Sequence, residues 1–507
     1  MAWIVGLHIG QRVSKMTVKL SSSNLAKLPS KVSGPKYDRA ALKAGIVHFG
    51  VGNFHRSHQA VYLDDLFNSG LGHDWALIGA GVFEGEKVGR SKLEEQDWLT
   101  TVVEQDQGHM SARVTGAMID FLTPGDAAAV IEQLADPAIK IVSLTITEGG
   151  YFIDPASGKF NPAHPDIVAD AQPGAAPKTV FGIILAGLVR RRADGIVPFT
   201  VMSCDNIPHN GHVTSDGVIG LARLIDEDLA DWVRDKVAFP NGMVDRITPA
   251  TTDRERGILA SDFGLEDNWP VFCEPFKQWV LEDHFTAGRP PLEKAGVQFV
   301  KDVSPYELMK IRILNGGHAT IAYPAGLMDI HFVHEAMQEP LVRGFLAKLE
   351  RDEIIPTVPP VPDTVLEDYY QLIERRFSNP KIGDTIRRLC LDGSNRQPKF
   401  IIPTIADRLK AGKDVAGLAL ESALWCRYCF GTTDSGAVIE PNDPSWDRTQ
   451  ATASAAKDAP GAWLAMDDIY GDVGRSPVFA QAFAHALDVL WANGARETLT
   501  RYLAGKL

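Results

Sequence analysis

Hydrophobic positions in the first 300 residues fall into short apolar runs that alternate with segments of helical spacing. The apolar runs are 45–52, 75–82, 140–146 and 199–205. The segments with apolar residues three and four positions apart are 54–70, 126–137 and 179–195. Strands that are apolar on both faces and alternate with helices form parallel sheets covered by helices. The pattern therefore predicts a Rossmann-like α/β domain.

From about residue 300 the spacing becomes helical almost throughout, and strand-like runs nearly vanish. The helical segments are 305–328, 332–354, 363–377 and 476–494, and the Pro-rich stretch 354–363 is predicted to be a loop. The fold class is thus predicted as α/β, with a Rossmann-like parallel sheet domain followed by a mostly α-helical C-terminal domain. The predicted division is a partly disordered N-terminal extension at 1–36, the sheet domain at 37–300 and the helical domain at 301–507.

Composition narrows the possible partners. The 507-residue chain has 51 Lys and Arg against 64 Asp and Glu, a net charge of −13. Nucleic acids and anionic membranes reward a basic surface, so neither is expected as the main partner. No apolar run approaches the roughly 18 residues of a membrane span. The first fifteen residues lack the basic start and cleavage site of a secretory signal, which favours a cytoplasmic protein.

Five cysteines are scattered through the chain, too few for a disulfide framework in a protein of this length. Cys426 and Cys429 form a C-x-x-C, but the surrounding stretch is apolar and offers no second pair of ligands. Buried thiols are a better interpretation than a zinc or redox site.

A glycine turn follows the first predicted strand. Gly50-Val51-Gly52 supplies the first two glycines of a G-x-G-x-x-G pattern, and His55 stands where the third would be. In a strand–turn–helix context such glycines let the backbone approach a dinucleotide pyrophosphate. A plain tight turn remains the alternative.

An acidic residue after the second strand bears on the choice of cofactor. Glu84 and Glu86 both follow the strand that ends near Val82, and Glu86 is the preferred candidate for binding the adenosine ribose hydroxyls. A carboxylate there would repel a 2′-phosphate, which favours NAD over NADP. Either glutamate could instead be solvated.

The segment from Lys310 to His318, KIRILNGGH, carries the candidate chemistry. At about 100° per residue, Lys310, Asn315 and His318 share an arc of about 140° on one helix face. Gly316 and Gly317 cost about 1 kcal/mol each in a helix, and close approach to a ligand would explain them. A helix crossing with a solvent-reaching lysine is the alternative.

Oxidising a secondary alcohol needs a base and donors for the oxygen. The sequence has no recognisable zinc motif, so no metal is expected. An ordinary lysine, with a pKa of about 10.4, is a poor base at neutral pH. Lowering that pKa to about 7 takes roughly 4 kcal/mol, which apolar burial and an oxidised nicotinamide could supply for Lys310.

Several sequence blocks together resemble the long-chain, metal-independent polyol dehydrogenase family. They are GIVHFGVGNFHRSHQAVYLDDL, IVSLTITEGGY, FTVMSCDNIPHNGHV, FPNGMVDRITPAT, CEPFKQWVLEDHF, MKIRILNGGH and RRLCLDGSNRQPKF. The resemblance runs from about residue 37 to the C-terminus. It implies a monomeric enzyme with an NAD-binding domain, a helical domain and a polyol site between them. The blocks are most similar to those of family members that interconvert mannitol and fructose.

The resemblance also implies roles for individual residues. It makes Lys310 the general base, Asn206 and Asn315 the oxyanion hole, and His318 a donor to substrate oxygens. The remaining implied roles are proton passage to solvent for Glu148, polyol binding for Asp245 and Arg388, and cofactor binding for Gly50, Gly52, Phe54 and Glu86. Without the family blocks, Asp245 could simply pair with Arg246.

Other functions stay open from the sequence alone. Tyr306 and Lys310 match Y-x-x-x-K, in which a tyrosine would be the base. Within the same family, arabinitol oxidation and fructuronate reduction are alternatives. From a different class, the chain could be a catalytically inactive nucleotide-binding protein. The candidate residues are intact, which argues against that: Lys310, Asn315, His318 and Asn206.

Overall fold

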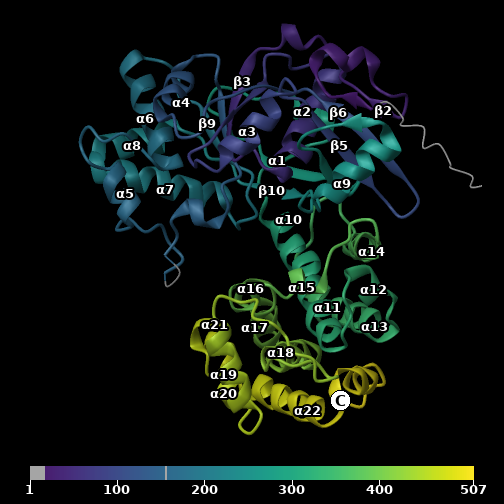
Figure 1. Cartoon of the computed structure of the whole chain (residues 1–507). Coiled ribbons are helices and arrows are strands. Elements are labelled where there is room, and N and C mark those ends of the chain that lie inside the picture. The colour runs from purple at the N-terminus through teal and green to yellow at the C-terminus, as the bar shows by residue number, and fades with distance from the viewer. Residues whose placement is uncertain (1–16, 155–156) are drawn as a thin grey trace, which may run out of the picture. The chain divides into compact units, whose positions relative to one another are not determined.

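The computed structural model describes residues 17–154 and 157–507, which form two compact units (Figure 1). The first unit extends to Lys301, except for a short turn at Asp106–Gly108 that groups with the second, and the second unit runs from Asp302 to Leu507. Residues 1–16 of the expected N-terminal extension lie outside the described part. Residues 17–36 are ordered and carry two short strands, β1 (Val18–Lys19) and β2 (Val32–Ser33).

A five-stranded parallel sheet forms the centre of the first unit. Its strands follow the order β7-β4-β3-β8-β9. Their bounds are β3 (Ala44–Phe49), β4 (Ala76–Ala80), β7 (Met118–Phe121), β8 (Ile141–Leu144) and β9 (Thr200–Ser203). The strand order reverses between β3 and β8, which is where open α/β sheets bind ligands at their carboxyl ends. The prediction of a Rossmann-like sheet is confirmed.

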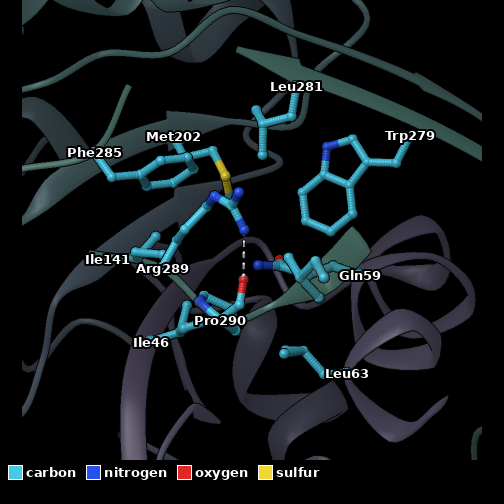
Figure 2. Close-up of a pocket in the computed structure, with 11 residues that line it drawn as sticks. Ile46, Gln59, Leu63, Ile141, Met202, Trp279, Leu281, Phe285, Arg289 and Pro290 are labelled. Atoms are coloured by element: carbon cyan, nitrogen blue, oxygen red, sulfur yellow. Dashed lines mark hydrogen bonds between the residues drawn. The ribbon is translucent and has the colours of Figure 1, made fainter. Parts of the chain in front are cut away.

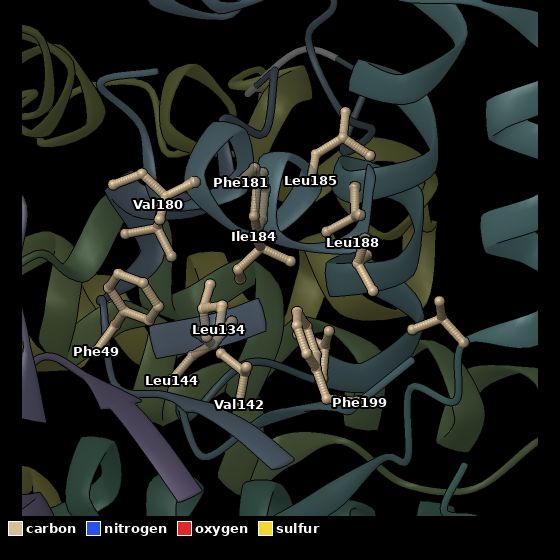
Figure 3. Close-up of a cluster of buried hydrophobic side chains, with 14 of the residues drawn as sticks. Phe49, Leu134, Val142, Leu144, Val180, Phe181, Ile184, Leu185, Leu188 and Phe199 are labelled. Atoms are coloured by element: carbon tan, nitrogen blue, oxygen red, sulfur yellow. The ribbon is translucent and has the colours of Figure 1, made fainter. Parts of the chain in front are cut away.

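One face of this sheet packs against two helices, α4 (Ala127–Ala135) and α6 (Val180–Asp194). Figure 3 shows the contact, in which side chains of both helices meet those of β3, β8 and residue 199. The labelled side chains are Phe49, Leu134, Val142, Leu144, Val180, Phe181, Ile184, Leu185, Leu188 and Phe199. Burial on both faces explains why these strands read as continuous apolar runs.

The helix expected over 54–70 is two helices, α1 (Asn53–Ser57) and α2 (Gln59–Asn68), with a break at His58. His58 adopts φ −117° and ψ −86°, outside the helical region. Its imidazole Nε2 lies 2.8 Å from the carbonyl of Gln278, so the break directs a buried side chain toward another strand.

Three smaller sheets, which the apolar pattern did not predict, complete the first unit. They have the orders β12-β5-β6-β2, β10-β13-β14 and β1-β11. Their strands not yet given are β5 (Thr100–Gln105), β6 (Met110–Thr115), β10 (Gly242–Asp245), β11 (Leu265–Glu266), β12 (Val271–Cys273), β13 (Gln278–Glu282) and β14 (Gln298–Val300). The remaining helices are η1 (Ser22–Lys27), η2 (Arg39–Ala41), α3 (Glu86–Glu94), η3 (Glu148–Tyr151), α5 (Pro165–Asp170), α7 (Asn210–Ile225), α8 (Glu227–Lys236), α9 (Asp253–Ile258), η4 (Leu259–Phe263) and η5 (Leu292–Ala295).

The second unit is helical, and its described residues form no strand after Val300. Its first helices are α10 (Ser304–Met309), η6 (Lys310–Asn315), α11 (Gly316–Leu327), α12 (Val333–Gln338), α13 (Pro340–Leu349), η7 (Glu350–Ile354) and η8 (Ile355–Thr357). The others are α14 (Leu366–Phe377), α15 (Ile386–Leu389), α16 (Gly393–Phe400), α17 (Ile402–Lys410), α18 (Ala416–Cys429), α19 (Trp446–Ala456), α20 (Gly461–Leu464), α21 (Asp467–Gly474) and α22 (Pro477–Leu503). The prediction of a mostly helical C-terminal domain is confirmed.

None of the helices within 17–154 and 157–507 is both long and apolar enough to cross a bilayer. All five cysteines are buried and unpaired, as expected for Cys426 and Cys429, which lie in α18.

Candidate active site

The glycine turn after β3 fits the backbone geometry that a dinucleotide turn requires. Gly50 has φ +89°, and a Cβ on it would lie 2.0 Å from the carbonyl oxygen of Thr145 in the loop after β8. Only glycine can therefore occupy this position. Gly52 caps α1, and a Cβ there would meet nothing closer than an oxygen of Gly50 at 3.9 Å. Apart from its chain neighbours, no described protein atom therefore lies closer than 3.9 Å to the Cβ position of Gly52.

His55, which replaces the third glycine, packs against the strand through another histidine. Its ring stacks on that of His48 in β3 with centroids 3.5 Å apart. His48 contacts the hydroxyls of Ser143 at 2.8 Å and Thr145 at 2.9 Å. Burial lowers the pKa of His48 to about 3 and that of His55 well below its ordinary value, so both rings are neutral. The stacked rings thus connect α1, which follows the turn, to β3, which precedes it.

Phe54 is half-buried beside this turn and stacks on His58, with ring centroids 4.8 Å apart. It is one of the expected cofactor-binding residues, and α1 places it within two residues of Gly52.

A cavity of about 310 Å³ opens at the carboxyl ends of β4 and β7. It is lined by Val51, Gly85, Glu86, Gly89, Phe121 and Trp269, among others. The Glu86 carboxylate accepts a hydrogen bond from the Phe83 N–H at 2.8 Å and lies over Gly81. Burial raises the pKa of Glu86, while the Phe83 and Val82 amides act in the opposite direction. Glu84 is exposed and pairs with Lys87, so Glu86 is the acid that lines the cavity.

A second hollow lies beneath the same sheet and is apolar (Figure 2). Ile46, Ile141 and Met202 line it from the sheet, and Trp279 and Leu281 line it from β13. It has no room for a water molecule, so it is a packing gap rather than a ligand site.

Glu148 and Asn206 lie at the same edge of the sheet as the glycine turn. Glu148 begins η3 after β8, Asn206 follows β9, and both are exposed. Thr147, just before Glu148, has φ +61°, which is unusual for a β-branched residue. The strain of about 1–3 kcal/mol persists only where neighbouring groups hold the backbone.

Asp205 holds the backbone at Thr147 in this conformation. It was not among the candidates from the sequence. Its carboxylate accepts hydrogen bonds from the N–H groups of Ile146 at 2.8 Å and Thr147 at 3.0 Å. The Tyr151 hydroxyl donates to the same carboxylate at 2.7 Å. Its place directly before Asn206 in SCDN was the only signal of a role in the sequence.

Asp245 is the last residue of β10 and is buried. Its neighbour Arg246 pairs with Glu104 at 2.5 Å and donates to the carbonyls of Glu274 and Ser57. Arg246 thus has its own structural ion pair with Glu104.

In the second unit, Lys310 and Asn315 begin and end a π-helical turn, η6. The expected arc of about 140° assumed α-helical geometry and is wrong for this stretch. A π-turn joins residues i and i+5, so it brings Lys310 and Asn315 to the same side of the helix. Both are buried, with exposed fractions of 6% and 8%. Single π-turns of this kind are frequent at functional sites.

His318 follows on α11 and is held by an aromatic contact. Its ring stacks on Phe377 of α14, with centroids 4.3 Å apart. Its Nε2 is buried and has no hydrogen-bond partner among the described residues. Burial first, and then the charges of Arg388, Arg376, Arg396 and Lys310, lower the pKa of His318 well below its ordinary value. The imidazole is therefore neutral and can accept or donate one hydrogen bond.

The glycine pair in this helix has a different cause from the one expected. A Cβ on Gly317 would lie 3.2 Å from a carboxyl oxygen of Glu350, whereas one on Gly316 would make only ordinary contacts. Glu350 is fully buried, and burial raises its pKa well above the usual range. At Gly317 the close approach is thus to this buried acid of η7.

Arg388 lies on α15, half-exposed, and forms an ion pair with Asp384. It is close enough to His318 for its charge to lower the histidine pKa. Tyr306, the alternative base, is buried, and its hydroxyl donates to the Pro362 carbonyl at 3.3 Å. No group of three His, Cys, Asp or Glu side chains in the described ranges could hold a metal ion.

Two family models match nearly the whole chain. The model described as the mannitol dehydrogenase Rossmann domain matches residues 44–294, and the mannitol dehydrogenase C-terminal domain matches residues 302–491. A mannitol 2-dehydrogenase of Cereibacter sphaeroides is 62% identical over 474 residues, covering 93% of this chain and 99% of the relative.

Two solved structures agree with this match. A Pseudomonas fluorescens mannitol 2-dehydrogenase, in a ternary complex with NAD and D-mannitol, is 43% identical with a TM-score of 0.87, covering 96% of this chain and 100% of that one. A substrate-free D-sorbitol dehydrogenase is 35% identical with the same TM-score of 0.87, covering 95% of this chain and 100% of that one. The chain therefore belongs to the mannitol dehydrogenase family.

Proposed function

We propose that this protein is a polyol dehydrogenase that oxidises D-mannitol to D-fructose with NAD+, and catalyses the reverse reaction with NADH. Membership of the mannitol dehydrogenase family supports this, as does the 62% identity to a mannitol 2-dehydrogenase. The related Pseudomonas fluorescens enzyme binds NAD and D-mannitol. The single observation that carries the proposal is the π-turn that brings Lys310 and Asn315 to one side of the helix.

The first unit suits NAD as the cofactor. Gly50 shapes the turn, the open space at Gly52 leaves room for a pyrophosphate, and Phe54 flanks it. The Glu86 carboxylate in the cavity would accept hydrogen bonds from ribose hydroxyls and repel a 2′-phosphate. Bound there, NAD+ supplies the hydride acceptor of the reaction.

Each polar side chain has a task in alcohol oxidation. Lys310, as the neutral amine, takes the proton from the reacting hydroxyl. The carboxamides of Asn206 and Asn315 donate hydrogen bonds to the same oxygen as it becomes a carbonyl oxygen, and they stay neutral throughout. The unpartnered Nε2 of His318 is available to a substrate oxygen.

Three further residues complete the proposal. Asp245 and Arg388 bind the remaining polyol hydroxyls, and Glu148, exposed at the start of η3, passes the proton from Lys310 to solvent. No step needs a metal ion, since the amine and the carboxamides perform the tasks that zinc performs elsewhere.

Replacing either oxyanion-hole residue should slow turnover strongly. We expect Asn206→Ala and Asn315→Ala each to lower kcat by about 10²–10³, because one donor to the developing charge is lost. Mannitol-dependent NADH formation at saturating substrate measures this effect. Asn493→Ala, which removes an exposed asparagine of α22, is the control and should leave kcat unchanged. Turnover of both site variants at the control rate would refute the assignment.

A panel of substrates tests the reaction itself. Mannitol, arabinitol and sorbitol are assayed with NAD+ and NADP+, and fructose and fructuronate with the reduced cofactors. We expect mannitol and fructose with NAD(H) to give the highest kcat/KM. A preference for arabinitol or fructuronate would move the assignment within the family. No turnover with any of these pairs would favour a protein that only binds the nucleotide.

We also propose that the enzyme is a monomer, which the family resemblance supports, and that it acts in the cytoplasm, a reducing compartment that suits its five unpaired cysteines. Light scattering tests the first part, with a mass near 55.3 kDa expected for one chain.

A further inference from the structure

The carboxyl ends of β8, β9 and β10 lead to three of the residues assigned to the polyol reaction: Glu148 and Asn206 follow β8 and β9, and Asp245 is the last residue of β10. Each residue comes from a different strand, and β10 belongs to a different sheet from β8 and β9. A precise arrangement of the three therefore needs bonds that cross from loop to loop.

One aspartate makes such bonds. The Asp205 carboxylate accepts the main-chain N–H groups of Ile146 and Thr147 at 2.8 and 3.0 Å, one on each oxygen. These bonds reach from the exit of β9 to the exit of β8. They end next to Glu148, at the one residue of this loop before η3 whose φ is positive.

The hydroxyl of Tyr151 reinforces this contact from the far end of η3. It donates to Asp205 at 2.7 Å and lies 2.6 Å from the hydroxyl of Ser203, the last residue of β9. Both ends of the short helix that begins with Glu148 are thus bound to one carboxylate. Hydrogen bonds to an ionised carboxylate are roughly twice as strong as neutral ones.

The main-chain carbonyl of Asp205 is connected to β10 by hydrogen bonds through Asn210. The side-chain amide of Asn210 donates to the Asp205 carbonyl at 3.0 Å and to the Gly242 carbonyl at 2.7 Å. Its side-chain oxygen accepts the Gly242 N–H at 2.9 Å. Asn210 is fully buried, and Gly242 begins the strand that ends at Asp245.

We propose that Asp205 is a positioning residue of the polyol site: its carboxylate fixes the loop that carries Glu148, and its main chain fixes the loop that carries Asn206. Asn210 extends the same network to the strand of Asp245. The inference rests on the proposed function, because it takes the roles of these three residues from there. Asp205 itself touches neither substrate nor cofactor in this scheme.

The groups around Asp205 also shift the pKa of its carboxyl group. Burial raises the pKa of Asp205, the three donated hydrogen bonds lower it, and the charge of Glu148 raises it. Removing the Glu148 charge should therefore lower the pKa of Asp205, so that its carboxyl group is ionised over a wider range of pH.

Asp205→Asn tests the proposal, because the amide keeps the size and presents an NH₂ group to one of the two main-chain donors. We expect kcat with mannitol to fall by about tenfold or more, since a misplacement of about 1 Å can cost about 100-fold. The KM for NAD+ should stay within about twofold, because the carboxylate of Asp205 binds Ile146, Thr147 and Tyr151, none of which is assigned to the cofactor. Adding Thr147→Gly to Asp205→Asn should raise kcat at least about threefold above that of Asp205→Asn alone, because glycine adopts positive φ without strain.

The chain offers a matched control in Asp170. This buried aspartate accepts two main-chain N–H groups, of Lys178 and Thr179, and the Thr179 hydroxyl, the same set of donor types as Asp205 has. Asp170→Asn should lower the melting temperature comparably and leave kcat within about twofold of wild type.

These variants distinguish a failure of the proposed function from a failure of the positioning role of Asp205. If Asn206→Ala and Lys310→Ala keep full turnover, the proposed function fails. If they lose turnover while Asp205→Asn keeps more than half of it, only the positioning role fails. A parallel loss of NAD+ affinity, or no recovery with Thr147→Gly, also overturns it. Should Asp205→Asn not fold, Tyr151→Phe takes its place, and wild-type kcat in that variant overturns the proposal.

Discussion

Replacing Lys310 by alanine should abolish most mannitol oxidation while leaving cofactor binding intact. General base catalysis contributes about 10²–10⁴ in rate, so we expect kcat to fall by about 10³. Lys310 is buried at the start of the π-turn. The measurements are NADH formation with mannitol and NADH binding followed by fluorescence. Added small primary amines should restore part of the activity, since they can occupy the space left by the side chain.

Two controls accompany this variant. Lys348→Ala removes a lysine of the same unit that pairs with Asp352 on the surface, and should leave kcat unchanged. Tyr306→Phe removes the hydroxyl that donates to Pro362 and should retain most activity. If Lys310→Ala turned over at the wild-type rate, or if Tyr306→Phe were the inactive variant, the assignment of the base would be wrong.

A Gly50→Ala substitution should destroy the cofactor site and much of the stability of the first unit. Alanine at φ +89° is strained by about 1–2 kcal/mol, and its Cβ would lie 2.0 Å from the Thr145 oxygen. The turn must then move away from the loop after β8, with an expected total cost of about 3–5 kcal/mol. Denaturant unfolding measures this cost, and we expect NADH affinity to fall more than about tenfold.

Two other glycines sharpen the interpretation. Gly195 also has positive φ, at +68°, but nothing lies within 4 Å of its Cβ position, so Gly195→Ala should cost only about 1 kcal/mol and leave NADH binding unchanged. Gly52→Ala meets no close protein atom and should keep the stability while weakening NADH binding. Equal NADH affinity in Gly50→Ala and Gly195→Ala would contradict a cofactor role for this turn.

The sequence predicted the architecture well because the signals were long and redundant. The central strands are apolar on both faces, so they stood out as runs, and the helices of the second unit repeat the same spacing many times. The strands of the smaller sheets, such as β12 and β14, have three residues each and take their places from distant partners. No local pattern encodes such pairings, which is why they were not predicted.

The candidate site was predicted residue by residue, but its geometry was not. The spacing of Lys310 and Asn315 suggested one helix face, yet the wider turn that aligns them depends on tertiary contacts. The break at His58 depends likewise on a carbonyl more than 200 positions away, that of Gln278. Asp205 directly precedes Asn206, yet it was not among the candidates. Its carboxylate binds the main-chain N–H groups of Ile146 and Thr147, and main-chain partners leave no signal in the sequence.

The π-turn at η6 determines how this helix should respond to the loss of one residue. Four residues separate Lys310 from Asn315, one more than an α-turn would hold between aligned side chains. Loss of any one of them would let the stretch relax into regular α-helix, with better backbone geometry. The residues after the turn, including His318, would then keep nearly the same orientation about the helix axis, because an α-turn aligns residues i and i+4 as the π-turn aligns residues i and i+5. We therefore expect the helix to tolerate the deletion of one residue between Lys310 and Asn315 better than a deletion within α11, where no extra residue is present to absorb it.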